Sequence, residues 1–584
     1  AGRPQKAFSV FKGCILDSMY MGLCPGNFGM TTYFDMARGE AQRDFGDAVG
    51  IFSRALIEGL FGIRPDALEG NLTICPGFPD EWEWARLRHP DIVFSYQRDG
   101  QTESYSIRPR FPYSFRLVLQ IPARGAEVER LAVNGRSVSW KPMEESVDIP
   151  RIEIIPPQAE TYAVEIVWKN SLSAQVKTAP VAAAAGSWQA EIQSAHFQQV
   201  YDPQKALDEV QLSSRLIQGK AVGTEGHRTV FARVQQGQMK WLVPIPFEIR
   251  PAFEIVGSPR QREGSLRFRI RNNTSLPFGP VSVHMGEWTQ KTSLWIEPNG
   301  ISEEIILEGK DVPLVPGSNR LSAESADGRS VEGVVVNWKI SSNESEKLEA
   351  AALQQIFNDK LSRIFQNEYV SPRSPFCSLA IPKQGIGSWC DYTRTFEVND
   401  SGLRRKAQEQ GGRLILPGGI GFEIPTEADA ANIVFTSQWD NYPAEVSIKL
   451  SGRARHLYLL MAGSTNSMQS RIDNGEVVVF YEDGSAERLA LHNPTTWWPI
   501  DQDYFIDDYG FRRREPIPPR VYLKAGQTGL YDISEFKGKG GQVPGGAATV
   551  LDMPLRPDKT LQSLTVRTLT NEVVIGLMGA TLVR

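Results

Sequence analysis

The sequence predicts a mainly β protein that is built from several β-sandwich domains and preceded by a short α-helical segment. From Ile92 onward, apolar and polar residues alternate over short runs, which is the period of a half-buried strand. Asp99-Gly100 and Asn134-Gly135 separate such runs and supply the positive φ angles that tight hairpins need. At ~150 residues per domain, the 584-residue chain is long enough for about four hydrophobic cores.

The charge balance excludes two classes of partner. The formal net charge is −5, from 63 basic and 68 acidic residues, so the chain has no bulk attraction for nucleic acid or an anionic membrane. No apolar run approaches the ~20 residues that cross a bilayer. The first residues, AGRPQKAFSVFKG, lack the apolar core of a signal peptide. We therefore expect no nucleic acid partner, no membrane span and no signal peptide within this chain.

The cysteines are scattered and give no metal-binding pattern. There are five of them and only six histidines, with no C-x-x-C pair, so we expect no metal site and no cofactor. Cys377 and Cys390 could form a disulfide in an oxidising compartment, and buried free thiols are the alternative.

Residues 1–90 are predicted to be mainly helical. One helix is expected from Phe8 to Tyr20 and a longer one over residues 37–61. The second has an apolar face with helical spacing, and Gly62 and Pro65 mark its end. The residues of that face are Ala41, Phe45, Ala48, Val49, Phe52 and Leu56.

The middle of the chain is predicted to form two β units. Residues 91–170 have the pattern of an antiparallel sandwich that closes near Trp168. Residues 171–250 are expected to begin with an Ala/Ser/Pro-rich linker over 171–187 and to continue as strands, with a hairpin at Gln236-Gly237.

The remaining residues are predicted to form two further domains. Short strands near Phe253, Leu266, Val281, Ile305 and Val334 indicate an immunoglobulin-like sandwich over residues 251–342. Residues 343–584 are expected to contain one amphipathic helix over 345–368, followed by a jelly-roll, galactose-binding-like sandwich.

Two segments near the N-terminus carry a resemblance to a known family. Gly59-Leu60-Phe61-Gly62-Ile63-Arg64-Pro65 and Leu72-Thr73-Ile74-Cys75-Pro76-Gly77-Phe78-Pro79 resemble the end of the last hairpin in bacterial six-hairpin glycosidases, which are α-L-rhamnosidase-like in layout. The resemblance implies that residues 1–90 are the end of an (α/α)6 toroid. It also implies a periplasmic or extracellular glycoside hydrolase that acts on a poly- or oligosaccharide. The other hairpins would come from a missing N-terminal part of the same polypeptide or from another chain.

Under that resemblance, the catalytic candidates are the carboxylates Asp35, Glu40 and Asp44. Glycoside hydrolysis commonly uses one carboxylic acid to protonate the leaving oxygen and one carboxylate to activate water or attack the sugar. Glu40 and Asp44 are four residues apart and would share a helix face. The alternative is that acidic residues in the first turn stabilise the helix N-terminus.

A second candidate site lies in the C-terminal domain. Tryptophan rings beside Asp, Asn and His side chains offer an apolar surface and hydrogen-bonding groups for sugar hydroxyls. The proposed substrate-binding residues are Trp439, Asp440, Asn441, His492, Trp497 and Trp498. The alternative is that these tryptophans fill gaps between sheets.

The close tryptophan pairs Trp82/Trp84 and Trp497/Trp498 add one expectation. We expect one member of each pair to reach a surface or an interface, since such pairing is unusual for strand residues that only fill a core.

The function predicted from the sequence is therefore part of a glycoside hydrolase that uses a carboxylate acid/base pair and carries accessory β-domains. The alternative is a non-catalytic carbohydrate-binding or structural multi-domain protein.

Overall fold

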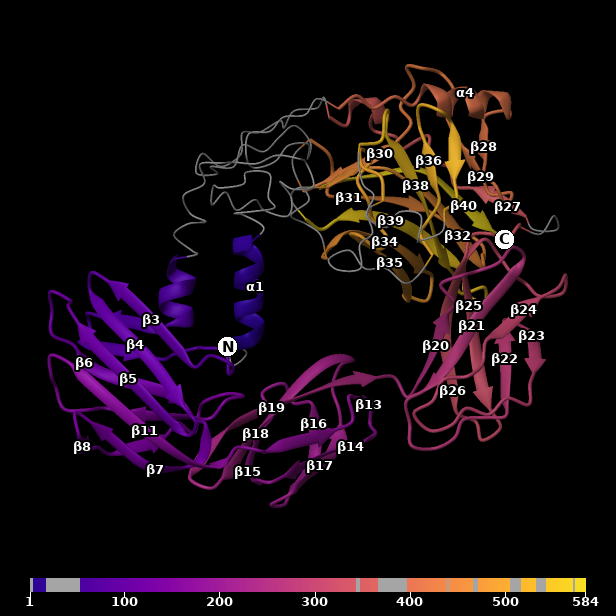
Figure 1. The fold of residues 1–584 in the computed structure, drawn as a ribbon. Helices are drawn as coiled ribbons and strands as arrows, with labels where there is room; N and C mark the ends of the chain where they lie inside the picture. The colour runs from indigo at the N-terminus through magenta and orange to yellow at the C-terminus, as the bar shows by residue number, and fades with distance from the viewer. Residues whose placement is uncertain are drawn as a thin grey trace. The chain divides into compact units, whose positions relative to one another are not determined.

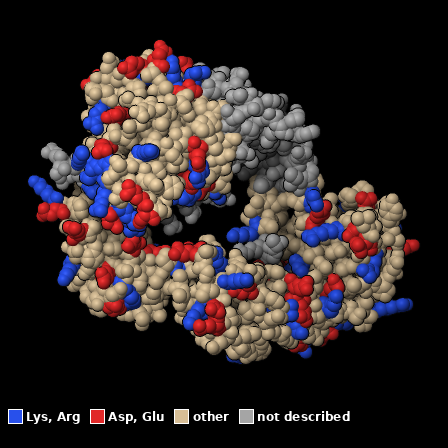
Figure 2. Space-filling view, turned by 180° about the vertical axis from the view of Figure 1, so that it is seen from behind, with Lys and Arg blue, Asp and Glu red and all other residues tan. Residues whose placement is uncertain are grey.

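The computed structural model describes residues 4–16, 53–342, 347–365, 396–438, 441–465, 471–504, 516–531, 542–570 and 573–584. The chain divides into two compact units, Ala1–Ala252 and Phe253–Arg584. Each unit consists mostly of antiparallel strands in stacked sheets, so the predicted mainly β, multi-domain fold is confirmed (Figure 1). On the face drawn in Figure 2, basic and acidic side chains are intermixed.

The described helical residues of the first unit are α1 (Pro4–Leu16), residues 53–54 and the π-helical turn η2 (Ala55–Leu60). The expected helix from Phe8 overlaps α1, and η2 lies at the end of the predicted helix 37–61. Residues 17–52, with the catalytic candidates Asp35, Glu40 and Asp44, lie outside the described residues.

The junction between η2 and the first sandwich explains the glycine in the Gly59–Pro65 segment. Gly62 has a φ of +69°, and a Cβ atom there would lie 1.9 Å from the Cys75 carbonyl oxygen. Only glycine can adopt this positive φ and also leave room for the Cys75 carbonyl. The Phe61 ring packs edge-on against Phe78, with ring centroids 5.3 Å apart. This segment therefore joins the helix to the sandwich by close backbone contact and aromatic packing.

The first sandwich consists of two sheets whose inner faces share one core. Gly100, with a φ of +55°, turns the chain between two strands, and Asn134-Gly135 does the same with φ angles of 51° and 76°, so both predicted hairpins are confirmed. The strand order of the first sheet is β1 (Ile63–Asp66), β2 (Asn71–Ile74), β6 (Arg116–Pro122), β10 (Arg151–Ile154), β9 (Trp140–Pro142). The strand order of the second sheet is β3 (Trp84–His89), β4 (Ile92–Asp99), β5 (Thr102–Pro109), β11 (Tyr162–Ser171), β7 (Gly125–Val133), β8 (Arg136–Ser137).

The second sandwich also has two sheets, and it includes residues that were predicted to be a linker. The prediction of a linker over 171–187 is wrong, because this segment forms two paired strands and the start of a third. Ala182 and Ala183 are buried, so the small residues that suggested a linker fit against the interior. The strand order of one sheet is β12 (Gln175–Thr178), β14 (Ser187–Gln193), β17 (Leu216–Ala221), β16 (Leu207–Leu212). The strand order of the other is β13 (Val181–Ala183), β19 (Met239–Arg250), β18 (Gly226–Gln236), β15 (His196–Tyr201).

The hairpin between β18 and β19 connects the two sandwiches of this unit. Gly237 has a φ of +57°, which confirms the hairpin predicted at Gln236-Gly237. The Gln238 amide donates to the Ala126 carbonyl at 2.9 Å, and the Val128 amide donates to the Gln238 side chain at 2.8 Å. These bonds fix the hairpin tip on β7 of the first sandwich.

The immunoglobulin-like domain predicted over 251–342 forms a sandwich of three and four strands, and the expected strands are present. The three-stranded sheet has the order β20 (Phe253–Gly257), β21 (Ser265–Asn272), β24 (Ile305–Glu308). The four-stranded sheet has the order β23 (Trp288–Lys291), β22 (Val281–Met285), β25 (Gly317–Ser325), β26 (Ser330–Asn337).

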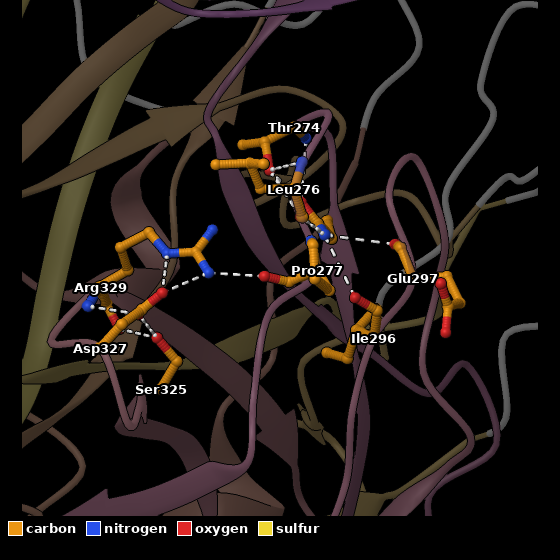
Figure 3. A network of polar contacts seen from close by, with 9 residues as sticks. Thr274, Leu276, Pro277, Ile296, Glu297, Ser325, Asp327 and Arg329 are labelled. Atoms are coloured by element: carbon orange, nitrogen blue, oxygen red, sulfur yellow. Dashed lines mark hydrogen bonds and ion pairs between the residues drawn. The ribbon is translucent and has the colours of Figure 1, made fainter.

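A polar network holds one end of this domain together (Figure 3). The Asp327 carboxylate accepts a hydrogen bond from Arg329 Nε at 2.8 Å and another from the Ser325 hydroxyl. Arg329 Nη2 also donates to the Pro277 carbonyl at 2.5 Å, which joins the β25–β26 turn to the loop after β21. The bonds from Arg329 and Ser325 hold the pKa of Asp327 below its ordinary value.

The last domain has an eight-stranded sheet facing a four-stranded sheet. Core side chains lie on both faces of the larger sheet, and all of β40 is buried. The larger sheet contains β27 (Leu348–Ala350), β40 (Val573–Val583), β32 (His456–Met461), β38 (Ala547–Pro554), β36 (Arg520–Tyr522), β37 (Gln527–Gly529), β30 (Val434–Ser437) and β33 (Ser464–Thr465). The smaller contains β31 (Glu445–Lys449), β39 (Leu561–Thr568), β34 (Asp473–Tyr481) and β35 (Ala486–His492).

Shorter elements complete this domain: η3 (Leu361–Arg363), α4 (Ser401–Glu409) and the pair β28 (Arg413–Ile415) and β29 (Gly421–Glu423). The prediction of a helix over 345–368 is wrong, because β27 pairs with β40 and, within the described residues 347–365, the only helical element is the 3-10 turn η3. The Asn358 side chain donates to the Phe435 carbonyl and accepts from the Phe435 amide, at 2.9 and 2.8 Å. Pairing with distant strands therefore overrides the local helical pattern.

A buried aspartate joins the immunoglobulin-like domain to the last domain of the same unit. Asp552 accepts hydrogen bonds from the amide and hydroxyl of Ser318, at 2.5 and 3.1 Å, and lies 2.8 Å from His456 Nε2. A Cβ atom at Gly317 would lie 2.5 Å from the Asp552 carboxylate, so glycine permits this approach.

The Asp327 network predicts a pH-dependent contribution to stability. Because the folded pKa is lowered, the stabilisation is complete above the ordinary value of 3.8 and is lost as the pH falls below it. Asp327→Asn should lower the thermal midpoint of the second unit at pH 7, and the difference from the unmodified chain should shrink by pH 3. Calorimetry at pH 7, 5 and 3 measures this difference. Asp311→Asn, at an exposed residue, is the control, and a pH-independent difference for Asp327→Asn would contradict the prediction.

Candidate functional site

The most complete candidate site is a groove on the outer face of the first sandwich, which we call the β3–β11 groove. It has a volume of about 460 Å³ and crosses β3, β4, β5, β11 and β7. Inward-facing residues of these strands fill the core, so the alternate residues form the outer face. Lining residues include Trp84, Arg86, Ser95, Gln97, Ser104, Ser106 and Glu165.

Strand register arranges these side chains in two rows across the sheet. In one row, Trp84 lies opposite Gln97, Gln97 opposite Ser104, and Ser104 opposite Glu165. In the other row, Arg86 lies opposite Ser95, and Ser95 lies opposite Ser106. Serines lie in the middle of both rows: Ser104, next to Gln97, in the first, and Ser95 and Ser106 in the second. The floor of the groove therefore carries hydroxyl groups, with the larger side chains of Trp84 and Arg86 along the β3 edge.

Trp84 stands at the rim of the groove on the edge strand β3. Its exposed fraction is 66%, and the Arg86 guanidinium carbon lies 5.9 Å from its ring centroid. This is a cation–π contact between neighbouring residues of one strand face. Trp82 is half-buried and packs against Phe8, with ring centroids 4.9 Å apart. The expectation that one member of this pair reaches a surface is confirmed for Trp84.

A buried carboxylate supports the groove from inside. Glu103 is 1% exposed and accepts hydrogen bonds from Tyr96 and Trp168 at 3.0 Å, and from Arg124 Nε at 3.2 Å. Tyr105 donates to the same carboxylate at 3.3 Å. Four donors around one carboxylate satisfy a charge that would be costly to bury alone.

The electrostatics of this network follow from its burial. Burial and then the Glu103 charge raise the pKa of Tyr96 and of Tyr105, so both hydroxyls stay protonated as donors. Burial alone would lower the pKa of Arg124, but the charges of Glu103 and Asp80 raise it. Arg124 therefore stays cationic beside Glu103.

The sequence-predicted site in the C-terminal domain is only partly described. Trp439 and Asp440 lie outside the described residues. Trp497 and Trp498 are 1% and 6% exposed, so neither ring of this pair reaches the surface. Trp497 packs in the core between the two sheets, and Trp498 meets Tyr504 edge-on at 4.9 Å. The alternative reading, that such rings fill gaps between sheets, describes both of them.

The polar members of that site differ from each other. His492 Nδ1 lies 2.8 Å from the Asp473 carboxylate, and Arg488 and then His492 lower the pKa of Asp473. His492 thus belongs to a surface ion-pair chain on β34 and β35. The two polar side-chain atoms of Asn441, Oδ1 and Nδ2, are buried, and neither has a hydrogen-bond partner among the described residues. As sugar-binding residues, Asn441 and His492 stay predictions.

Metal and thiol chemistry have few candidates in the described part of the chain. No group of three or more His, Cys, Asp or Glu side chains that could hold a metal ion occurs there. Cys75 is a free thiol and accepts a hydrogen bond from Arg151, while Cys377 and Cys390 lie outside the described residues. No helix among the described residues is long and apolar enough to span a bilayer.

Comparison with known proteins identifies no family for this chain and gives only distant structural neighbours. The sequence matches no protein-family model and no curated protein. Among solved structures, SGBP-B of the Bacteroides ovatus mixed-linkage glucan utilization locus, in complex with a heptasaccharide, is 10% identical, covers 80% of this chain and 92% of its own, and has a TM-score of 0.16. An I-band fragment of titin is 9% identical over 41% of this chain and 92% of its own, at 0.13. The four N-terminal Ig domains of Dscam1 are 14% identical over 48% and 87%, also at 0.13. With TM-scores this low, these neighbours support no argument about this chain.

Sequence reasoning identified Trp84 as a surface candidate but missed the other groove residues. The signal was present in the segment Glu103 to Ile107, where serines alternate with buried residues. Alternation alone indicates an outer face, and the groove becomes visible only when β5 is placed between β4 and β11.

The Glu103 network predicts that Glu103→Gln destabilises the first unit. Glutamine removes the charge beside Arg124 and cannot accept all four hydrogen bonds, and breaking a buried ion pair costs about 3–5 kcal/mol. The thermal midpoint of this unit should fall by roughly 6–20 °C, measured by calorimetry on the full chain. Glu129→Gln, at an exposed residue of β7, should change the free energy of unfolding by no more than about 0.5 kcal/mol. Equal effects of the two substitutions would contradict the prediction.

Proposed function

We propose that this chain is the glycan-binding part of a carbohydrate-active protein and that the β3–β11 groove binds an oligo- or polysaccharide. One observation carries the proposal: an exposed tryptophan stands at the rim of a groove with small hydroxyl-bearing residues on its floor. A Trp ring offers a flat apolar surface to the C–H face of a sugar. Serine hydroxyls and the Gln97 amide both donate and accept hydrogen bonds, as sugar hydroxyls require.

The groove is suited to a neutral sugar because its charges are nearly balanced. Glu165 forms an ion pair with Arg130, and the one guanidinium in the groove without a carboxylate partner among the described residues, that of Arg86, lies beside the Trp84 ring. Strand pairing fixes the backbone of all these residues, so only their side chains need ordering on binding.

Trp84→Ala should weaken saccharide binding by about 2 kcal/mol or more, which is roughly 30-fold, because truncating an aromatic anchor has this effect in binding sites. A glycan array of hemicellulosic and pectic oligosaccharides identifies the ligand, and calorimetric titration measures the affinities. The matched control is Trp295→Ala, since Trp295 is 56% exposed but does not line the groove.

A second substitution tests the groove floor without removing the ring. Ser104→Phe fills the floor at an exposed position and should abolish binding. If Trp84→Ala and Ser104→Phe both bind as the unmodified chain does, the groove is not the binding site.

Glycoside hydrolysis is the second function that we propose. The order of helix, glycine-dependent junction and β-sandwich supports it, since this is the order of the six-hairpin glycosidases that the sequence resembles. Asp35, Glu40 and Asp44 remain the proposed acid and base residues, and Trp439, Asp440, Asn441 and His492 a proposed further sugar contact. The rest of the toroid would belong to the same polypeptide or to another chain, in the periplasm or outside the cell.

The hydrolase proposal predicts that the 584-residue chain has no hydrolytic activity by itself. Its carboxylate candidates lie within ten residues of one another, whereas hydrolysis needs two carboxylates on opposite sides of the bond. Release of reducing sugar from pectic and hemicellulosic polysaccharides should be detectable only when the remaining hairpins are supplied. If this chain has comparable activity with and without the remaining hairpins, the assignment of the active site to the toroid is wrong.

A further inference from the structure

A second groove lies on the immunoglobulin-like domain, and we call it the arginine groove. It has a volume of about 590 Å³ and runs beside β20 and β21. Arg267, Arg269 and Arg271 alternate along β21 with buried apolar residues, so three guanidinium groups share the outer face of the strand. Arg267 and Arg269 line the groove.

Two more arginines reach the groove from the loop that precedes β21. Arg260 and Arg262 are exposed and flank Gln261, which is 7% exposed. The Gln261 side chain donates to the Arg267 carbonyl at 2.7 Å and accepts from the Arg267 amide at 2.9 Å. The buried Asn337 side chain donates to the Arg262 carbonyl at 2.8 Å. Buried amides therefore fix the loop so that both arginines lie beside the strand.

The groove has an uncompensated positive charge. Four arginines line it, against one carboxylate, Glu304, which lies 3.0 Å from Arg267. Arg260, Arg262 and Arg269 are exposed, and none of them forms an ion pair with another described residue. The whole chain has a net charge of −5, so this excess is a local feature.

We propose that the arginine groove binds the carboxylates of an acidic, uronic acid-rich polysaccharide. Guanidinium groups bind carboxylates through paired hydrogen bonds, and several arginines along one groove suit a chain with repeated carboxylates. Val256 and Ile301 also line the groove and offer apolar contacts to sugar rings. The choice of a saccharide over an acidic peptide rests on the proposed function above. The site itself is separate from the β3–β11 groove.

The test uses the full chain and sodium polygalacturonate as the probe. The variant R260Q/R262Q/R269Q should bind polygalacturonate at least tenfold more weakly in 50 mM NaCl, measured by biolayer interferometry. Raising NaCl to 300 mM should weaken binding of the unmodified chain, because salt screens exposed charges. The matched control R405Q/R413Q/R453Q removes the same charge from exposed residues of the last domain and should change binding less than twofold.

Further variants separate this site from the β3–β11 groove. Trp84→Ala should keep salt-sensitive polygalacturonate binding, and the triple groove variant should keep binding of neutral oligosaccharides. If the triple variant unfolds, Arg269→Glu, at a single exposed strand position, should by itself reduce binding at least tenfold.

Three results would overturn the assignment. The first is unchanged polygalacturonate binding by the triple variant or by Arg269→Glu. The second is an equal loss in the control variant. The third is competition by polyglutamate or double-stranded DNA as effective as that of polygalacturonate, which would make the groove a general polyanion site.

Discussion

The carboxylate of Glu103 is the constraint on which the first sandwich and its groove depend. It lies in the core, and its donors come from β4, β5 and β11 and from Arg124, the residue before β7. A charge in this position is tolerated only with its full set of partners, so the network specifies how these strands align. Because the inner face fixes the sheet, the outer face is free to carry small polar side chains around Trp84.

The immunoglobulin-like domain repeats this arrangement with neutral groups. Gln261 and Asn337 are buried amides that bond backbone atoms of the loop before β21. Their bonds fix a loop that would otherwise have many conformations, and they hold its arginines at the surface. In both domains, buried polar side chains determine the backbone, and exposed side chains on the same strands determine what the surface can bind.

Local features of the fold could be predicted from the sequence, and features that depend on distant partners could not. The hairpins at Asp99-Gly100, Asn134-Gly135 and Gln236-Gly237 depend on a few neighbouring residues. The helix predicted over 345–368 failed because residues 348–350 pair with β40, more than two hundred residues later. The tryptophan pairs show that prediction of the site has the same limit. In both pairs the two tryptophans are close in sequence, yet Trp84 is exposed whereas Trp497 and Trp498 are in the core. Which strands are neighbours decides whether a ring is covered.

Fluorine NMR of the full chain labelled with fluorotryptophan tests directly whether the β3–β11 groove binds sugar, because the 13 tryptophans include members of both candidate sugar sites. Signals are assigned by single substitutions, and a binding oligosaccharide from the glycan array is then titrated. The β3–β11 groove predicts that the Trp84 signal shifts with saturation at the measured affinity, while Trp497 and Trp498 stay unchanged. A saturable shift of Trp439 or Trp498 with an unchanged Trp84 would contradict the account and move the binding site to the C-terminal domain.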